Sequence, residues 1–568
     1  MNNGRRNVPL THPGVAYSQY FLRKILSSSC VSVNDNMMSH LILLPFLLLY
    51  PFLFLGRTTA LPHQREIRNS KTIRKDADVA LQPRDLESIE EAFPAMANAL
   101  EVMQSQFWDQ SSSTWPTGID WTRAVFNTHM SATLSTIANY QAESYQNEID
   151  IYFPQVVSFY NGENAVSLTQ QKYDDMQWVI LEWLEAIKFT NLYSSINQSF
   201  DGKQYVPEFA HRARIFWDLA SQGYNTTLCG GGMLWTDQLA PYKNAITNQL
   251  FIASSIGMYL YFPGDNNTNP SPVAGAPNNS LISLPPITAH DQRYLNAAIT
   301  EYQWLSNSNM TNAQGLYADG FHITNWTSSA NIGTGKCDAR DESVYTYNQG
   351  VLLSGVRGLW DATGQSNYLD DGYTLVNNVI TATGWGQPNG TWAGLGSDGI
   401  LQDLCDVDGS CSQDAQAFKG IFFHHLTLFC APLSMEKAEA RSTVFVASAT
   451  QAQDHRSKCN GYSAWVQHNA QAAYGTRNHT GVYGEWWDVS SQSRPKQPQD
   501  ASDYRNKGIP QNTLWRLPSN PSISADGMTP VGNTSMPDPN ERGRGRTVET
   551  QSGGLGVMRC LVQAQEEA

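Results

Sequence analysis

The pattern of apolar and polar positions between Arg84 and about Gly475 is that of a series of helices. Apolar residues recur with helical spacing in short segments, Gly, Asn, Pro and Ser separate these segments, and alternating strand-like runs are few. The pattern predicts eleven helices, one fewer than twelve. They lie at Asp85–Gln106, Ala132–Tyr145, Met176–Tyr193, Phe209–Ser221, Lys243–Tyr261, Asp291–Ser306, Tyr347–Ala362, Tyr368–Thr383, Ala415–Phe429, Met435–Ala449 and Tyr462–Ala473.

An internal repeat indicates how these helices are organised. The helix that carries Asn248-Gln249 returns one hundred residues later in the helix that carries Asn348-Gln349, and each is followed by a turn and an amphipathic segment. A weaker third copy begins at Phe418. Such repeats predict stacked helical hairpins that share a core. About six hairpins can close into a ring that forms one domain, and the alternative is an open solenoid.

The first 60 residues have the pattern of a leader. Residues 41–55 are an uncharged apolar run of 15, which is shorter than the ~20 residues of a membrane span and has the length of the apolar part of a signal peptide. Small residues follow at Thr58-Thr59-Ala60. We therefore expect a signal peptide within residues 1–60 and a linker over 61–84; the alternative is a membrane anchor that stays in place.

The last part of the chain, residues 476–568, predicts a disordered tail. Pro, Ser, Asn, Gln and Gly are abundant, and no apolar periodicity is evident up to Ala568. A lipid-anchor signal would need a terminal hydrophobic run of ~10 to 20 residues, whereas the last residues include Arg559, Glu566 and Glu567. The tail therefore does not support a C-terminal lipid anchor.

Composition and charge narrow the class of protein. The formal net charge is -14, and 15% of residues are charged while 11% are aromatic. An acidic chain is a poor partner for nucleic acid, because phosphate binding needs a basic surface. Asn-X-Ser/Thr sequons are dense, as expected of a protein glycosylated in the secretory pathway. They lie at Asn197, Asn225, Asn266, Asn278, Asn309, Asn325, Asn389, Asn478 and Asn533.

The cysteines agree with an oxidising compartment, in which disulfides are the default. Cys30 precedes the cleavage site, which leaves seven. We expect Cys405 to pair with Cys411 across a short Gly-containing loop, and Cys229 with Cys337 next. An odd count leaves one thiol free or paired outside the chain.

Two adjacent carboxylates, Asp174 and Asp175, stand where a strongly apolar helix begins. Taken alone, such a pair is ordinarily a helix cap that complements the helix dipole. Neighbouring Cα atoms are ~3.8 Å apart, so diverging side chains can place the carboxyls ~5 to 5.5 Å apart, the spacing in retaining glycosidases, whereas inverting enzymes need ~6.5 to 9.5 Å. Two close carboxylates also repel, which keeps one protonated while the other is ionised. The pair is therefore suited to act as nucleophile and acid.

A series of motifs in a fixed order, from about Leu86 to Ala473, carries a family resemblance. The motifs are Tyr173-Asp174-Asp175 with Trp178, Cys229 to Gly232 with Trp235, Lys243 to Asn248, Asp319-Gly320, Tyr345 to Gly350, and Cys411 to Asp414 with Phe418-Lys419-Gly420. This series resembles glycoside hydrolase family 76, the α-1,6-mannanases that include fungal cell-wall members. The resemblance implies an all-α fold, an (α/α)6 barrel, over residues 85–475, in agreement with the hairpin repeats.

The resemblance also implies an activity and roles for the pair. By position, Asp174 would be the nucleophile and Asp175 the acid/base in retaining endo-hydrolysis of α-1,6-mannan. If a sugar hydroxyl replaced water, the same chemistry would transfer glycan chains. A third hypothesis is a mannan-binding or wall-scaffold protein without catalytic turnover. We expect a secreted or wall-associated monomer, with no nucleic-acid partner, whose partner is a mannose-containing glycan.

Six further residues are candidates for substrate binding. Trp178, Trp235 and Tyr345 are placed to stack on sugar rings, although aromatic residues at helical spacing are as often part of a core. Asp319 is a candidate for hydrogen bonds to mannose hydroxyls, although a turn explains it equally well. For Asn348 and Gln349, the repeat at positions 248 and 249 favours a structural role in at least one copy.

Other chemistry has little support. Gly230 to Gly232 lack the context of a P-loop, and no zinc motif is present. His424 and His425 adjoin an apolar run and are expected in the core, and Glu182 and Glu185 are expected to be structural. We therefore predict no metal and no cofactor.

Overall fold

The computed structural model describes residues 86–567, apart from 274–282, 389–392, 404, 407–408, 437–443, 491–537 and 542. The predicted leader over 1–60, with its apolar run at 41–55, and the linker over 61–84 lie outside the described residues. The described residues belong to one compact unit, Asp78–Ala568.

Among the described residues, twelve long helices alternate along the chain between an outer and an inner position. The outer helices are α1 (Ile89–Phe107), α3 (Gln146–Gly162), α6 (Val206–Ala220), α8 (Gln292–Asn307), α10 (Ser366–Ala382) and α14 (Ser463–Gly475). The inner helices are α2 (Asp120–Tyr140), α5 (Tyr173–Ile196), α7 (Ala245–Tyr261), α9 (Tyr347–Thr363), α12 (Phe418–Cys430) and α15 (Val548–Glu566). Shorter helices are α4 (Ala165–Leu168) and α13 (Ala449–Asn460), with 3-10 turns at Gly202–Tyr205, Ser221–Gly223, Ala415–Ala417, Trp487–Ser490 and Pro539–Glu541.

The six inner helices form a closed ring. Each packs against the next in the order α2, α5, α7, α9, α12 and α15, and α15 packs back against α2. Outer helices pair with inner ones, as α6 does with α5 and α8 with α7. This is the predicted (α/α)6 barrel, and the closure excludes the open solenoid. The repeated segments lie on α7, α9 and α12, as inner helices of successive hairpins.

The sequence explains which helices are inside. In α7 every residue from Ala245 to Leu260 is buried, as expected of a helix that is apolar on all sides. In α8 only Tyr294, Ala298, Glu301, Tyr302 and Leu305 are buried, which is the single apolar stripe of a surface helix.

Three expectations for the helices were wrong. Met435–Ala449 is not a helix where it is described; α13 instead begins at Ala449. Helix α2 begins at Asp120, twelve residues before the predicted start at Ala132, because its first half buries polar side chains such as Asn127 and His129 that conceal the apolar pattern. Helix α3 was missed, since it contains Pro154 and is rich in polar residues.

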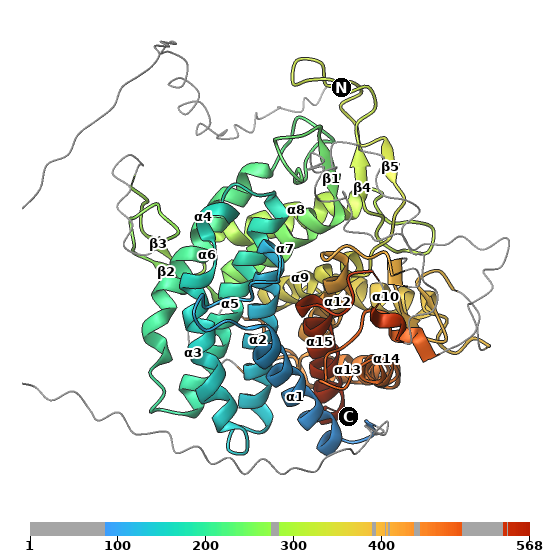
Figure 1. Ribbon diagram of the computed structural model, residues 1–568. Coiled ribbons are helices and arrows are strands. Elements are labelled where there is room, and N and C mark those ends of the chain that lie inside the picture. The colour runs from blue at the N-terminus through green and yellow to red at the C-terminus, as the bar shows by residue number, and fades with distance from the viewer. Residues whose placement is uncertain are drawn as a thin grey trace, which may run out of the picture. The chain divides into compact units, whose positions relative to one another are not determined.

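The prediction of a disordered tail over 476–568 is wrong for its last helix. Residues 548–566 form α15, which is buried from Val548 to Val562 and completes the inner ring between α12 and α2. Figure 1 shows α15, in red, among α1, α2 and α12. Residues 476–489 also pack on the barrel, with Tyr483 and Trp487 buried. Residues 491–537 lie outside the described residues.

Glycines make the crossing of α12 and α15 unusually close. A Cβ atom on Gly420 would lie 2.4 Å from Cα of Gly553, and one on Gly556 would lie 2.8 Å from the carbonyl oxygen of Gly420. These contacts are with backbone, so no side chain can move away to relieve them. Three glycines in one helix resemble a flexible segment in sequence, but here they permit contact between two inner helices.

The crossing gives a matched pair of variants. We expect Gly420→Ala to lower the free energy of unfolding by about 1 to 3 kcal/mol, the usual cost of overpacking. Gly553→Ala should be neutral or stabilising, because its Cβ would meet nothing closer than 3.9 Å and alanine favours a helix. Chemical denaturation of both variants measures the difference, and equal stabilities would contradict the close crossing.

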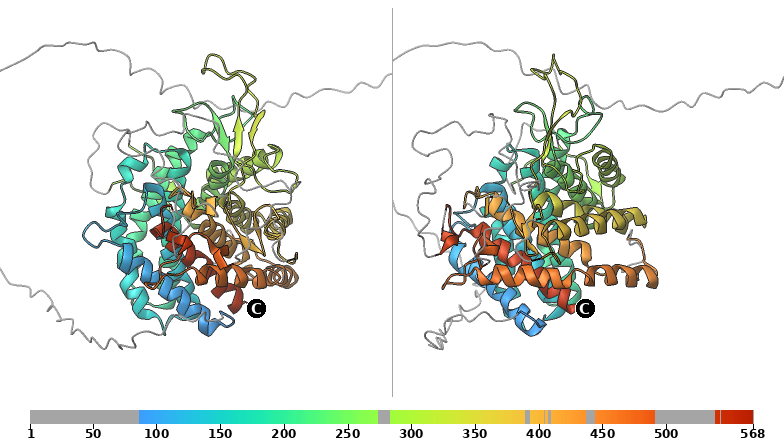
Figure 2. Two further views of the ribbon diagram at one scale, coloured as in Figure 1. Left: turned by 45° about the vertical axis from the view of Figure 1, so that its right-hand side comes forward. Right: turned by 90° about the vertical axis from the view of Figure 1, so that its right-hand side faces the viewer.

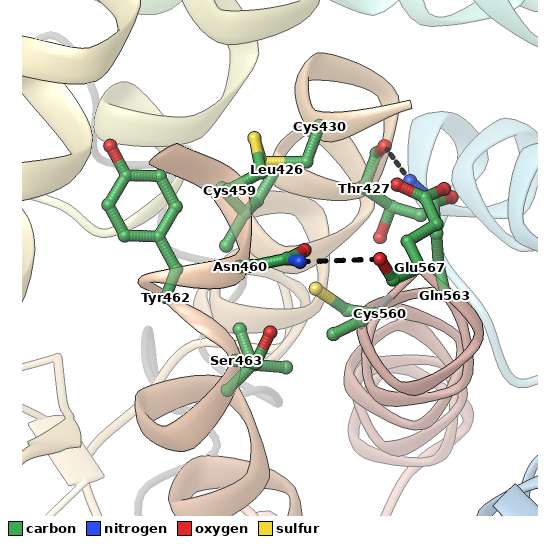
Figure 3. Close-up of a pocket in the computed structure, with 12 residues that line it drawn as sticks. Leu426, Thr427, Cys430, Cys459, Asn460, Tyr462, Ser463, Cys560, Gln563 and Glu567 are labelled. Atoms are coloured by element: carbon green, nitrogen blue, oxygen red, sulfur yellow. Dashed lines mark hydrogen bonds between the residues drawn. A yellow bond between two sulfur atoms is a disulfide. The ribbon is translucent and has the colours of Figure 1, made fainter. Parts of the chain in front are cut away.

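Three disulfides join the described residues. Cys229–Cys337 and Cys405–Cys411 confirm the predicted pairs, and Cys430–Cys459 joins α12 to α13. Cys560 on α15 is the free cysteine of the described part of the chain and is buried. Figure 3 shows it lining a small cavity with the Cys430–Cys459 disulfide, beside hydrogen bonds from Gln563 to the Thr427 carbonyl and from Asn460 to the Glu567 carbonyl. These contacts tie α15 to the rest of the barrel.

Short antiparallel strands lie in the loops that connect the helices. A three-stranded sheet has the order β1 (Tyr242–Asn244), β4 (Gly320–His322) and β5 (Ala339–Asp341), with Lys243 opposite Phe321 and Phe321 opposite Arg340. Two-stranded pairs are β2 (Gly264–Asp265) with β3 (Ile287–Thr288), and β6 (Gly396–Ser397) with β7 (Ile400–Leu401). The loops that carry β4 and β5 extend from one end of the barrel, as both views of Figure 2 show. None of the described helices combines the length and apolar character needed to cross a membrane.

Candidate active site

The inner helices begin at the same end of the barrel. Trp121 in the first turn of α2 stacks on Trp178 in the second turn of α5, with ring centroids 5.5 Å apart. Tyr347 at the start of α9 stacks on Phe418 at the start of α12 at 3.8 Å. Thr122 of α2 donates a hydrogen bond of 2.9 Å to the carboxylate of Glu549 at the start of α15. The positive ends of these helix dipoles therefore gather at this end.

Asp174 and Asp175 lie in the first turn of α5, as the sequence predicted. Asp174 is buried and Asp175 is partly exposed. The Asp175 amide donates 3.1 Å to the Asp174 carboxylate, and the Lys172 amide donates 3.2 Å to the Asp175 carboxylate. Asp175 therefore does cap the helix, but neither carboxylate is neutralised by a cation within ion-pair distance among the described residues.

The site raises the pKa of both carboxyls. For Asp174 the main cause is burial and the second is repulsion from Asp175, opposed by hydrogen bonds from backbone amides and from the Trp235 side chain. For Asp175, burial raises the pKa to about 7, against the hydrogen bond from the Lys172 amide. A carboxyl that titrates near neutrality can serve as a general acid.

Two further carboxylates surround Asp175. Asp414 and Asp120 both repel its charge and so favour its protonated form. Asp414 accepts a hydrogen bond of 2.8 Å from Nε1 of Trp121, which connects the loop before α12 to the start of α2. Negative charge therefore concentrates around Asp175, and this favours the acid role for that residue.

The predicted aromatic candidates differ in exposure. Trp178 and Trp235 are buried: Trp178 stacks on Trp121, and Trp235 contacts Asp174 and lies below the Lys172 ammonium at 5.4 Å. Tyr345 is partly exposed and packs edge-on against Phe418 at 5.6 Å. Trp235 therefore supports Asp174, Trp178 supports the ring of Trp121, and Tyr345 is the candidate whose ring is partly exposed.

Asp319 is held by two neighbours at the same end. Tyr242 donates a hydrogen bond of 2.5 Å to its carboxylate, and Nδ2 of Asn348 donates one of 3.2 Å. Burial raises the pKa of Asp319 to about 7. Asp319 is only 4% exposed, so the structure explains it as part of a buried polar network rather than as an exposed turn.

Asn348 and Gln349 are fully buried. The Gln349 side chain binds the backbone of the loop before β4: it accepts from the Tyr317 amide at 2.8 Å and donates to the Tyr317 carbonyl at 3.0 Å. It also donates to the Tyr345 carbonyl. Both side chains therefore position Asp319 and Tyr345, which is the structural role that the repeat also allowed. For Gln349, a hydrogen bond to substrate would replace one of these bonds to the loop.

The glycine loop before Trp235 is stabilised by a buried lysine rather than prepared for phosphate. The Lys243 ammonium donates hydrogen bonds to the carbonyls of Asn225, Gly231 and Gly232. The carbonyls of Gly231 and Gly232 face this ammonium, whereas a phosphate cradle is built from backbone amides that face the ligand.

Several residues of the site were not predicted from the sequence. Trp121, Tyr173, Tyr347, Asp120 and Asp414 are partly exposed around the pair. Burial raises the pKa of Tyr347, and the charges of Asp319, Asp174 and Asp414 add to the rise. Trp121 and Asp120 were hidden because the start of α2 was placed too late, whereas Tyr347 and Asp414 stood within recognised motifs but were not assigned to the site.

Comparison with known proteins agrees with this picture. Residues 266–494 match the model of Glycosyl hydrolase family 76; Asp174 and Asp175 lie outside this range. Among curated proteins no match is found.

Solved structures share the fold. Dfg5 from Chaetomium thermophilum, in complex with glucosamine, is 14% identical over 85% of this chain and 92% of its own, with a TM-score of 0.51. The GH76A α-1,6-mannanase from Salegentibacter sp. HEL1_6 is 16% identical over 83% of this chain and 99% of its own, with a TM-score of 0.47. Residues 266–494 are thus similar to glycosyl hydrolase family 76, and the helical barrel as a whole has the fold of Dfg5.

Proposed function

We propose that this protein is a retaining endo-glycosidase that cleaves α-1,6-mannosidic bonds in mannan. The observation that carries the proposal is the Asp174–Asp175 pair at the end of the barrel where the inner helices begin, with no cation of the described residues within ion-pair distance of either carboxylate. The match of residues 266–494 to Glycosyl hydrolase family 76 supports the reaction class. Partly exposed aromatic rings beside the pair, Trp121, Tyr345 and Tyr347, supply faces on which sugar rings can stack.

The first step needs one ionised and one protonated carboxyl. Burial raises the pKa of both Asp174 and Asp175, and repulsion from Asp175 adds to the rise at Asp174. The roles follow the family resemblance, in which Asp174 is the ionised member and attacks the anomeric carbon. Asp175, with its pKa raised to about 7, gives its proton to the glycosidic oxygen as the bond from that oxygen to the anomeric carbon breaks. The products of this step are a mannosyl ester on Asp174 and a free chain end.

The second step returns both groups to their starting state. Asp175, now ionised, takes a proton from water, and the water oxygen attacks the anomeric carbon and releases Asp174. If a sugar hydroxyl takes the place of water, the glycan is transferred instead of hydrolysed. Transglycosylation is therefore the alternative within the same site.

The surface of the protein supports a secreted location. Of the sequon asparagines that are described, Asn266, Asn309 and Asn325 are exposed, and the other described ones, Asn197, Asn225 and Asn478, are partly exposed. Three disulfides agree with an oxidising compartment. We propose that the enzyme acts outside the cell or at the wall as a monomer, because one chain supplies every residue of the site.

Digestion of linear α-1,6-mannan tests this function. The secreted protein should release short oligosaccharides whose new reducing ends keep the α configuration when first formed, as followed by NMR. Longer products formed with an added acceptor oligosaccharide would identify transfer. Binding of mannan without any new chain ends would instead identify a scaffold and contradict the enzyme.

The pH dependence follows from Asp175. Because this group must be protonated in the first step, kcat/KM should fall as the pH rises through about 7. On the acid side it should fall as the Asp174–Asp175 pair takes up a second proton, because the nucleophile must be ionised. Asp120→Asn removes a repelling charge and should move the basic limb to lower pH. Initial rates across pH 4 to 9 measure both limbs, and a basic limb that does not move in this variant would contradict the role of Asp120.

A further inference from the structure

A cavity made of two connected parts opens at the opposite end of the barrel from the Asp174–Asp175 pair. An inner chamber of about 200 Å³ and a mouth of about 450 Å³ share Glu185, Lys188, Leu260 and Tyr261 among their lining residues. These residues lie in the second half of α5 and the last turn of α7, whereas the carboxylate pair lies in the first turn of α5. Together the two parts have the volume typical of sites for small organic ligands, ~300 to 1,000 Å³.

Most charged groups of this cavity are paired. Lys188 contacts Glu185 at 2.7 Å, and Arg357 contacts Asp361 at 3.1 Å. Arg357 also donates to the carbonyls of Phe429, Ala431 and Pro432 after α12, so its guanidinium is accounted for as a helix C-cap.

Arg559 of α15 is different. Its side chain lines the mouth, yet the residue is only 4% exposed. It donates to Nδ1 of His424 at 2.8 Å and to the Thr136 hydroxyl at 3.3 Å. Neither acceptor carries a charge: a hydroxyl is neutral, and burial holds the pKa of His424 well below its usual range. Within the described part of the chain, no carboxylate lies within ion-pair distance of Arg559. Burying a charge without a counter-charge is costly.

Two structural explanations do not account for Arg559. It lies seven residues before the end of α15 at Glu566, and the attraction of a helix C-terminus for cations is confined to the last turn. Glu185 attracts it electrostatically, but that carboxylate is held by Lys188. The cavity therefore retains one positive charge that faces a space large enough for a ligand.

We propose that this cavity binds a small organic oxyanion, a carboxylate or a phosphate ester, with Arg559 as its principal partner. The guanidinium offers planar paired donors that match either group. Lys188, on the facing helix, supplies a second cation, and its ammonium already lies 5.1 Å from the centroid of the Tyr261 ring. The apolar side chains of Leu260 and Leu428 line both parts of the cavity and would contact the carbon body of the ligand. This site is separate from the proposed glycosidase site.

Calorimetric titration of the full chain with sodium acetate and with inorganic phosphate, at constant ionic strength in chloride, tests the proposal. We expect saturable one-to-one binding of at least one anion, and the anion that binds distinguishes a carboxylate from a phosphate site. Arg559→Gln should weaken binding at least about tenfold, as expected for loss of charged hydrogen bonds, while Arg559→Lys should weaken it less. Asp174→Asn should leave binding unchanged, which separates this result from the fate of the glycosidase proposal.

A further variant keeps the test valid if Arg559→Gln fails to fold. Lys188 is a quarter exposed, and Lys188→Gln should weaken binding both by removing a cation and by freeing Glu185 to pair with Arg559. No saturable binding of either anion by the folded wild-type protein would overturn the proposal. Equal affinity in the wild type and in the folded Arg559 or Lys188 variants would also overturn it.

Discussion

Replacing Asp174 or Asp175 by asparagine should abolish most of the release of oligosaccharides from α-1,6-mannan. The loss expected for Asp175→Asn is about 10²- to 10⁴-fold in kcat, the usual contribution of a positioned acid/base, and that for Asp174→Asn should be at least as large. Asparagine fills nearly the same volume, so the first turn of α5 should remain intact. Reducing-end assays on the purified variants measure the loss.

The leaving group distinguishes the two roles. In an aryl glycoside of α-1,6-mannobiose the leaving group is a phenolate, which departs without a proton. Asp175→Asn should therefore keep far more activity on this compound than on mannan. Asp174→Asn should be inactive on both, because no ester can form. If the substrate preferences of the two variants are reversed, the roles are exchanged within the pair.

A matched control separates chemistry from folding. Asp370 is exposed on the outer helix α10, so Asp370→Asn makes the same chemical change far from the site and should leave both activity and melting temperature unchanged. Mannan cleavage that survives in both Asp174→Asn and Asp175→Asn would refute the catalytic assignment.

The carboxylate pair could be predicted because its chemistry is local. Two adjacent acids before an apolar helix are visible in a short stretch of sequence. Only the structure shows that burial raises both pKa values and that Asp120 and Asp414 lie near Asp175. Those neighbours come from distant segments. Which loops meet at the end of a barrel depends on its closure, and no local pattern encodes that.

The buried roles of Asn348 and Gln349 show the same limit. Their positions at the start of an inner helix were evident from the repeat, but whether an amide faces a ligand or a backbone depends on the loop that packs against it. Here that loop is the one that carries Tyr317 and Asp319. The sequence thus predicted where these residues stand along α9 and left their partners undetermined.

The helix α15 was missed for a physical reason. Apolar periodicity identifies helices with one buried face, whereas α15 is buried on all sides and meets its neighbours through Gly553, Gly554 and Gly556. A Cβ on Gly554 would lie 2.3 Å from the ring of Tyr483. Small residues that allow close packing have the composition of a flexible tail, so composition alone favoured disorder.

Truncation after residue 537 should therefore prevent the barrel from folding. It removes α15, in which Leu555, Val557, Met558, Leu561 and Val562 are less than 5% exposed. Each such side chain contributes about 1.5 to 3 kcal/mol by burial, so their sum is comparable to the ~5 to 15 kcal/mol by which a domain is stable. The loss would also expose the faces of α1, α2, α12 and α14 that pack on α15.

Circular dichroism on heating and limited proteolysis measure this effect. The truncated chain should lose its cooperative transition and be cleaved within the barrel, whereas truncation after Glu566 should retain both the transition and the activity. That shorter change removes the hydrogen bonds from Asn460 to the Glu567 carbonyl and from Tyr140 to the Glu567 carboxylate, each worth about 1 kcal/mol. A chain ending at residue 537 that melts at the wild-type temperature would show that the ring does not need its sixth inner helix, and would restore the interpretation of this region as a tail.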